Sequence, residues 1–240
     1  LRWELGATNS LVIHLTLVPY LAAAGEPKTK PTQHSVKMLL ETGVQPDILV
    51  LRTEKPLTVE IKKKVALFCN VDKDSVIESV DVPTIYEVPL EMLKQKLDLT
   101  VLRKLNLPSD NEVELSDWTR LVDSIKHPKH EVSIALVGKY TELHDAYKSI
   151  VEAFIHGGAS NSCKVKIKWV NSEKIGEDNV ATLLGDVQGV LVAPGFGHRG
   201  IEGKISAIKY ARENQVPFFG ICLGMQCAVI EFARNVLKME

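Results

Sequence analysis

One of the four cysteines lies in a sequence pattern typical of an activated thiol. In the segment Phe-Gly-Ile-Cys-Leu-Gly, Gly220 precedes Cys222 by two residues and Gly224 follows it by two. A nucleophile between a strand end and a helix start needs a tight turn, and flanking glycines remove side chains that would clash there. The helix start stabilises a thiolate and offers amides to an oxyanion. We interpret Cys222 as a nucleophile, and Cys69 and Cys227 as buried apolar thiols.

A second glycine-rich segment, Val192-Ala-Pro-Gly-Phe-Gly-His-Arg-Gly200, follows the preceding predicted strand. Its glycines let the backbone approach a ligand closely, and its free amides can face an oxyanion. A plain turn would look similar. Because ligands of parallel sheets bind beyond the carboxyl ends of the strands, its position favours a binding role.

Strands and helices alternate around these motifs. Beyond residue 130, short apolar or alternating runs predict strands at 132–137, 164–170, 187–192 and 217–221. Helical spacing predicts a helix that Asp145 caps and Gly157-Gly158 ends, a segment up to Leu184, and helices at 202–213 and 224–237. Such alternation predicts βαβ units and a parallel, doubly wound sheet.

The first part of the chain is also mixed α/β. It predicts a helix at 35–42 ended by Gly43, a strand at 47–51, and a helix at 59–68 started by Thr58. The polar, turn-rich stretch 108–130, with one short helix, is typical of a linker. We therefore expect domains at 1–107 and 131–240.

Composition limits the partners. The 29 basic and 30 acidic residues give a net charge of −1, so no global field attracts a nucleic acid polymer or a membrane. The apolar stretch 11–24 is too short and too polar to span a bilayer. No two cysteines have the spacing of zinc ligands, and neither His127 with His130 nor a carboxylate cluster indicates a metal. We expect a reduced, cytoplasmic setting.

Local lysines could still bind an anion. Lys28 and Lys30 flank Thr29, and Lys62-Lys63-Lys64 adds further amines that could neutralise a triphosphate. A charge run is more often a solvated face.

The two glycine-rich motifs resemble the class I glutamine amidotransferase domain of the CTP synthase family. The segment Gly138-Lys-Tyr-Thr-Glu-Leu-His-Asp-Ala-Tyr-Lys-Ser149 is similar to the same family, as are segments 14–20 and 28–37. The block from Lys28 to Lys37 distinguishes this family from other amidotransferases. With this resemblance, a nucleotide site becomes the favoured interpretation of the lysines over a solvated basic face.

The resemblance implies two domains, each a mainly parallel doubly wound sheet: a P-loop-like synthetase part, then a flavodoxin-like amidotransferase part. Glutamine hydrolysis would proceed through a cysteine thioester. ATP would phosphorylate O4 of UTP, and the released ammonia would displace the phosphate to give CTP. Implied partners are ATP with Mg²⁺, UTP, glutamine, CTP as feedback inhibitor, GTP as activator, and further copies in a homotetramer.

The resemblance also assigns residues to the glutamine site. Cys222 would be the nucleophile and the amides of Gly195 and Leu223 the oxyanion donors, with Phe196 and Gln226 in the glutamine pocket. One departure is notable: the family commonly reads Pro-Gly-Gly-Phe-Gly where this chain has Pro194 before Gly195. Proline has no N–H, so the oxyanion site survives if the donor is Gly195.

Further residues are implied for the nucleotide sites. UTP or CTP would be bound by Lys28, Lys30, Gln33 and Lys64, and adenine by Arg52, Asp81 and Val82. Arg199 and Glu202 would lie in a mobile lid linked to GTP activation.

Two expected features are missing from the sequence. It contains no Gly-x-x-x-x-Gly-Lys-Ser/Thr loop, and none of the 18 residues after Cys222 is the histidine base that a cysteine nucleophile needs. The magnesium ligands would also lie elsewhere. We therefore expect both domains to be truncated, in an internal segment that makes no CTP and barely hydrolyses glutamine alone. A different cysteine-elbow hydrolase or glutaminase, or a non-catalytic nucleotide-binding assembly module, remain alternatives.

Overall fold

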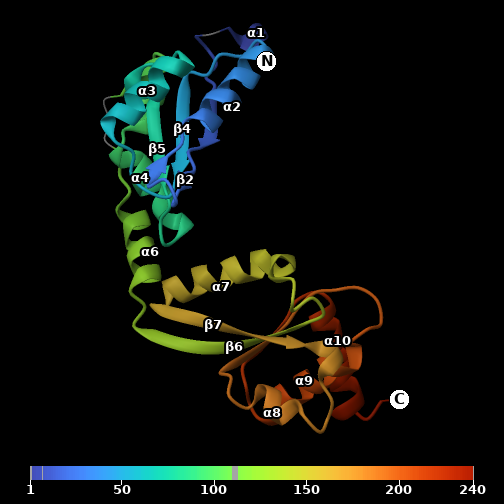
Figure 1. The fold of residues 1–240 in the computed structure, drawn as a ribbon. Helices are drawn as coiled ribbons and strands as arrows, with labels where there is room; N and C mark the ends of the chain where they lie inside the picture. Colours follow the sequence, from blue (N-terminus) through green and yellow to red (C-terminus); the bar gives the residue numbers. More distant parts are fainter. Residues whose placement is uncertain (1, 7, 110–112, 240) are drawn as a thin grey trace. The chain divides into compact units, whose positions relative to one another are not determined.

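The computed structural model describes residues 2–6, 8–109 and 113–239. The chain forms two units, Leu1–Thr119 and Arg120–Glu240, and each contains its own parallel sheet (Figure 1). The boundary falls within helix α6 (Ser116–Lys126), which occupies much of the stretch predicted as a linker.

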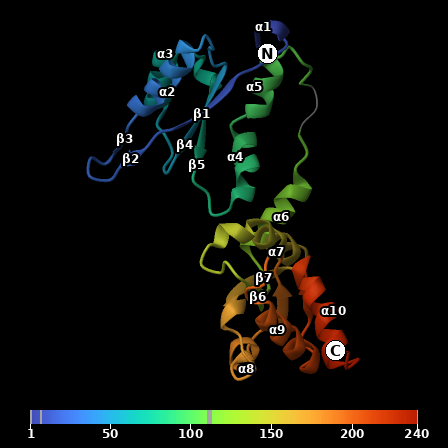
Figure 2. The same ribbon diagram turned by 90° about the vertical axis from the view of Figure 1, so that its right-hand side faces the viewer.

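The first unit is built on a three-stranded parallel sheet with the order β1-β4-β5. Its strands are β1 (Ile13–Leu17), β4 (Ile48–Thr53) and β5 (Val76–Val80). Figure 2 shows α2 (Lys30–Glu41) and α3 (Val59–Cys69) on one face, and α4 (Val88–Lys94) and α5 (Leu97–Lys104) on the other. Helix α1 (Arg2–Leu5) and a hairpin of β2 (Tyr20–Leu21) and β3 (Glu26–Pro27) complete it.

Strand β4 shows why this sheet is covered on both faces. Leu49 and Leu51 are buried against Val36 and Val65 of the first helix pair, whereas the intervening Val50 belongs to the core of the second pair. Successive side chains of a strand point to opposite faces, so a continuous apolar run needs two helical layers.

The second unit contains a four-stranded parallel sheet with the order β7-β6-β8-β9. Its strands are β6 (His130–Gly138), β7 (Cys163–Asn171), β8 (Gly189–Val192) and β9 (Phe218–Gly220). Helix α7 (Lys148–Ser160) covers one face; α8 (Val180–Leu184), α9 (Ile201–Glu213) and α10 (Leu223–Asn235) cover the other (Figure 1). In sequence order the strands lie 2-1-3-4, as in flavodoxin-like sheets. The predicted α/β class with mainly parallel sheets is confirmed in both units.

Some predicted boundaries are wrong. Helix α2 begins at Lys30 rather than at residue 35, because Pro31 is well placed in a first helical turn. A 3₁₀ turn occupies 144–147, so α7 begins at Lys148 and Asp145 does not cap it. Gly157 and Gly158 do not end α7.

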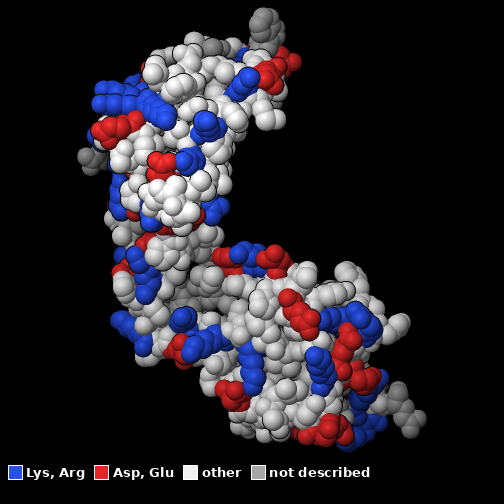
Figure 3. All heavy atoms as spheres, in the orientation of Figure 1, with Lys and Arg blue, Asp and Glu red and all other residues white. Residues whose placement is uncertain are grey.

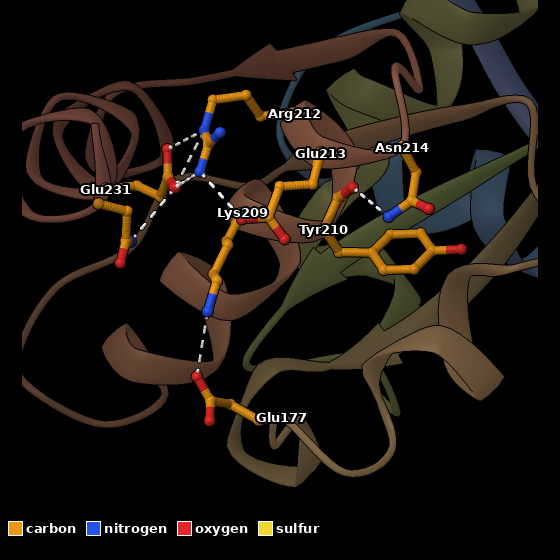
Figure 4. A network of polar contacts seen from close by, with 8 residues as sticks. Glu177, Lys209, Tyr210, Arg212, Glu213, Asn214 and Glu231 are labelled. Atoms are coloured by element: carbon orange, nitrogen blue, oxygen red, sulfur yellow. Dashed lines mark hydrogen bonds and ion pairs between the residues drawn. The ribbon is translucent and has the colours of Figure 1, made fainter.

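Helix α10 is joined to α9 by a buried carboxylate (Figure 4). Glu231 is 1% exposed and accepts from Arg212 Nη2 at 2.7 Å and from Asn235 Nδ2 at 3.2 Å. The hydrogen bond with Glu231 raises the pKa of the Arg212 guanidinium. These hydrogen bonds fix the helix that follows Cys222 onto its neighbour.

The surface carries both signs of charge. Figure 3 shows basic and acidic side chains interspersed over the visible face of each unit, without one extended surface of a single sign. Among the described residues, no helix is both long and apolar enough to cross a membrane.

Candidate active site

Cys222 lies in the turn between β9 and α10, with a backbone conformation that few residues adopt. Its φ is 52° and its ψ is −107°, and its side chain is exposed. A non-glycine residue held at positive φ is strained, and such strain persists where the surrounding structure imposes it. This geometry matches the strand-to-helix turn that presents a nucleophile at the top of an α/β sheet.

The two flanking glycines are required by close backbone contacts. A Cβ at Gly224 would lie 2.2 Å from the Val192 carbonyl oxygen, and one at Gly220 would lie 2.6 Å from the Gly224 carbonyl carbon. A side chain at Gly224 would push the turn away from β8, and one at Gly220 would push β9 away from the start of α10. The Gly-x-Cys-x-Gly spacing therefore has a steric cause here.

The glycine-rich segment, which we call loop 193–197, faces this turn. The Cβ position of Gly195 lies 3.7 Å from Leu223 Cδ2. The amides of Gly195 and Leu223 donate to no acceptor in the described parts of the chain, so both are available to a ligand. Pro194 lacks an amide, but the amide of Gly195 next to it remains.

The other predicted glutamine-site residues are open to solvent. Phe196 is 92% exposed at the tip of loop 193–197, and Gln226 is exposed in the first turn of α10. The amide of Gln226 donates to the Cys222 carbonyl at 3.0 Å, which places the two residues one helical turn apart.

Two lysines behind loop 193–197 were not predicted. Lys204 of α9 is fully buried and donates through Nζ to the Ala193 carbonyl at 2.7 Å. Lys139, just after β6, is 8% exposed and donates to the carbonyls of Phe196 and, at 3.3 Å, Gly197. Burial lowers the pKa of Lys204.

The burial of Lys204 could have been predicted from the sequence. Lys204 follows Ile201 by three residues and precedes Ile208 by four, so it lies on the apolar face of its helix. The burial of Lys139 could not be predicted in this way, because this residue follows a strand and has no helical spacing to apolar neighbours.

Arg199 and Glu202 do not meet. Arg199 forms an ion pair with Glu173 at 3.5 Å, whereas Glu202 pairs with Arg234 of α10 at 3.2 Å. All four side chains are substantially exposed.

In the first unit, the predicted triphosphate lysines lie around the hairpin and the helices beside it. Lys28 pairs with Glu26, whose pKa is lowered first by this hydrogen bond and also by the charge of Lys64. Lys30 begins α2 and is exposed. Gln33 donates to Thr29 Oγ1 at 3.3 Å. These residues gather near the carboxyl end of β1.

The predicted adenine residues are also brought together. Arg52 Nε lies 3.4 Å from Asp81 Oδ1, and Val82 follows, half-buried. They lie at the carboxyl ends of β4 and β5, where parallel sheets bind ligands.

No group of three or more His, Cys, Asp or Glu side chains in the described residues could hold a metal ion. The ligands of the magnesium ion stay a prediction, because Mg²⁺ is commonly held by only one or two carboxylates together with the phosphates of a nucleotide.

Comparisons with known proteins match both units. The family described as "CTP synthase N-terminus" matches residues 1–107, and "Glutamine amidotransferase class-I" matches residues 142–240. A curated CTP synthase of Cytophaga hutchinsonii is 66% identical over the whole chain, and one of Flavobacterium johnsoniae is 60% identical over 99% of it. The chain belongs to the CTP synthase family.

The chain spans 44% of the length of these two CTP synthases. A solved Trypanosoma brucei structure, titled as a CTP synthase glutaminase domain with bound acivicin, is 41% identical. The match covers 44% of this chain and 42% of the Trypanosoma brucei chain, with a TM-score of 0.41.

Proposed function

We propose that the protein makes CTP from UTP, with ATP as energy source and the amide of glutamine as nitrogen source. The observation that carries this proposal is Cys222 at positive φ between β9 and α10, facing loop 193–197. A thiol placed in this way, beside two free amides, suits acyl transfer through a covalent intermediate. Membership of the CTP synthase family supports it.

In the glutamine half, the Cys222 thiolate attacks the side-chain amide carbon of glutamine. The amides of Gly195 and Leu223 donate to the oxyanion, which collapses as the nitrogen takes up the proton lost by the thiol and leaves as ammonia, so that the acyl group remains as a thioester. Water then hydrolyses the thioester to glutamate. Phe196 and Gln226 line the glutamine pocket in this proposal.

In the nucleotide half, Lys28, Lys30 and Lys64 neutralise the triphosphate of UTP or inhibitory CTP, and Gln33 contacts the base. Arg52, Asp81 and Val82 line the adenine site. ATP, accompanied by Mg²⁺, phosphorylates O4 of UTP, and ammonia displaces the phosphate at C4. Arg199 and Glu202 respond to GTP. The active protein is a cytoplasmic homotetramer.

The nitrogen source separates this proposal from its alternatives. In the intact protein, Cys222→Ser should abolish glutamine-dependent CTP formation but leave formation from added ammonia unchanged. Cys163→Ser, which changes a half-buried thiol outside the site, is the control. Glutamine hydrolysis without any amination of UTP would instead indicate a glutaminase joined to another function.

The nucleotide half is tested separately. Lys30→Ala should raise the KM for UTP, whereas Lys37→Ala, which removes an exposed lysine from the same helix, should not. A protein that binds UTP through Lys30 but forms no CTP from glutamine or ammonia would be a non-catalytic nucleotide-binding module.

A further inference from the structure

Two buried ammonium groups lie directly behind loop 193–197. Lys204 has no exposed surface and Lys139 has 8%. Burying a charge is costly unless it is paired, yet neither Nζ has a carboxylate partner in the described parts of the chain. Their acceptors are main-chain carbonyls of the loop: Ala193 for Lys204, and Phe196 and Gly197 for Lys139. The cost of burial indicates a role beyond packing.

These contacts lie on both sides of one peptide bond. The carbonyl of Ala193 is fixed before the Pro194–Gly195 peptide, and the carbonyls of Phe196 and Gly197 are fixed after it. The ring of Pro194 restricts its own φ. The orientation of the free Gly195 amide therefore depends on peptides that the two lysines hold.

The lysines are themselves held by rigid elements. Lys204 belongs to the buried face of α9. The amide of Lys139 donates to the Tyr147 hydroxyl at 3.1 Å, and Tyr147 is 4% exposed. The two ammonium groups thus connect loop 193–197 to helix α9 and to the end of β6.

We infer that Lys139 and Lys204 are positioning residues that hold loop 193–197 so that the Gly195 amide faces the oxyanion formed at Cys222. The inference rests on the proposed glutamine hydrolysis. Neither lysine touches the reacting atoms; each acts through a carbonyl of the loop.

The test uses Lys204→Met and Lys139→Met in the intact protein. The control is Lys209→Met, which removes a lysine from the same helix α9 whose partner is the exposed Glu177, 3.3 Å away (Figure 4). Loss of an oxyanion donor costs about 10²–10³-fold in kcat, so loss of its support should cost about tenfold or more. We expect this fall in kcat for glutamine hydrolysis, with KM unchanged.

Two thiol probes distinguish positioning from general damage. Alkylation of Cys222 by iodoacetamide forms no oxyanion, so its limiting rate at high pH should match the wild type in all variants. The aldehyde analogue of glutamine forms a hemithioacetal whose oxygen takes the oxyanion's place, so its affinity should fall with kcat in the Lys139 and Lys204 variants. Lys204→Gln keeps a hydrogen-bond donor, so it should recover part of the kcat for glutamine hydrolysis and part of the affinity for the aldehyde.

Wild-type kcat in both methionine variants would overturn the inference. So would an equal loss of alkylation and aldehyde binding, because that result would show a distorted turn at Cys222. Failure of the proposed function gives a different result: the wild-type protein itself would form no adduct with the aldehyde while iodoacetamide still modified Cys222. Lys139→Met provides an independent result if Lys204→Met does not fold.

Discussion

At the scale of single residues, the site depends on groups kept in unfavourable states. Cys222 has a strained backbone, and Lys204 is a fully buried ammonium. Strain and buried charge both oppose folding, and proteins retain them where function requires them. Replacing either residue should therefore separate stability from activity.

The backbone strain at Cys222 predicts that Cys222→Gly is more stable than Cys222→Ala. Glycine adopts positive φ without a steric cost, so we expect a gain of about 1 kcal/mol in the free energy of unfolding relative to the alanine variant. Urea denaturation measures the difference, and both variants should lose glutamine hydrolysis. Equal stability of the two would mean that the turn is not strained.

The buried charge predicts a pH-dependent effect of Lys204→Met. Because burial lowers the pKa of Lys204, the unfolded chain binds the proton more tightly than the folded chain, and wild-type stability rises as the pH increases towards the ordinary lysine value. We expect the variant to be about as stable as the wild type, or more so, near pH 7. The stability of the variant relative to the wild type should be lower at pH 9.5 than at pH 7. Urea denaturation at both pH values tests this, and a constant difference would contradict it.

At the scale of elements, the turn at Cys222 depends on contact between α10 and β8. The closest approach is at Gly224, where a Cβ would lie 2.2 Å from the Val192 carbonyl oxygen. The position of α10 is fixed further along by Glu231 and Arg212. A backbone contact and an ion pair with a buried carboxylate therefore hold the helix that begins at the nucleophile.

Gly224→Ala should disrupt this contact. Because the obstacle is main chain rather than a flexible side chain, we expect a loss of about 3 kcal/mol of stability, together with loss of glutamine hydrolysis. Gly157→Ala is the matched control: its Cβ meets nothing within 4 Å on α7, so it should be neutral or stabilise by about 0.5–1 kcal/mol. Thermal unfolding of both variants provides the comparison.

Arg212→Met should leave the Glu231 carboxylate buried without its cation. We expect a clear loss of stability in urea denaturation, because the buried Glu231 carboxylate loses its charged donor. Arg234→Met breaks the exposed pair with Glu202 and should cost less than about 1 kcal/mol. Similar losses in both variants would show that the burial of Glu231 is unimportant.

Buried strands could be predicted from the sequence more easily than exposed ones. The strands β6 and β8 were predicted well because buried apolar runs of this length are distinctive. Strand β1 was not predicted: only Thr16 of its five residues is buried, where its hydroxyl meets Thr32 at 2.7 Å. Gly157-Gly158 did not end α7, because Gly158 serves instead to admit the Cys163 carbonyl, 2.3 Å from its Cβ position.

Near the candidate site, the local backbone could be predicted from the sequence but the long-range contacts could not. The glycines around Cys222 are a local pattern, so its turn could be read from the sequence. The contact of Lys139 with Phe196 joins residues 57 apart, and only the folded sheet brings them together.

At the scale of the whole molecule, the net charge is nearly zero, although charged side chains cluster in some regions. The net charge is −1, while Lys28 and Lys64 both act on Glu26 in one small region of the first unit. Attraction of an anion to this protein must therefore come from a few side chains. The two units should then differ in their response to salt.

Raising the ionic strength from about 0.05 M to about 0.5 M should weaken nucleotide binding more than glutamine binding. Salt screens exposed lysines that meet a triphosphate, whereas glutamine carries no net charge. The KM for UTP should rise several-fold and the KM for glutamine should change little. Steady-state assays of the intact protein measure both, and parallel shifts would contradict the assignment of the lysines.

The strand order of the second unit also has a consequence for biosynthesis. Strand β6 leaves the ribosome first, β7 and β8 pair with its two sides, and β9 pairs only with β8. The tight turn at Cys222 needs the Val192 carbonyl in place, so a nascent chain carries an ordinary flexible thiol there until β8 is seated. The strained backbone conformation of the nucleophile thus forms only once β8 and the start of α10 have packed together.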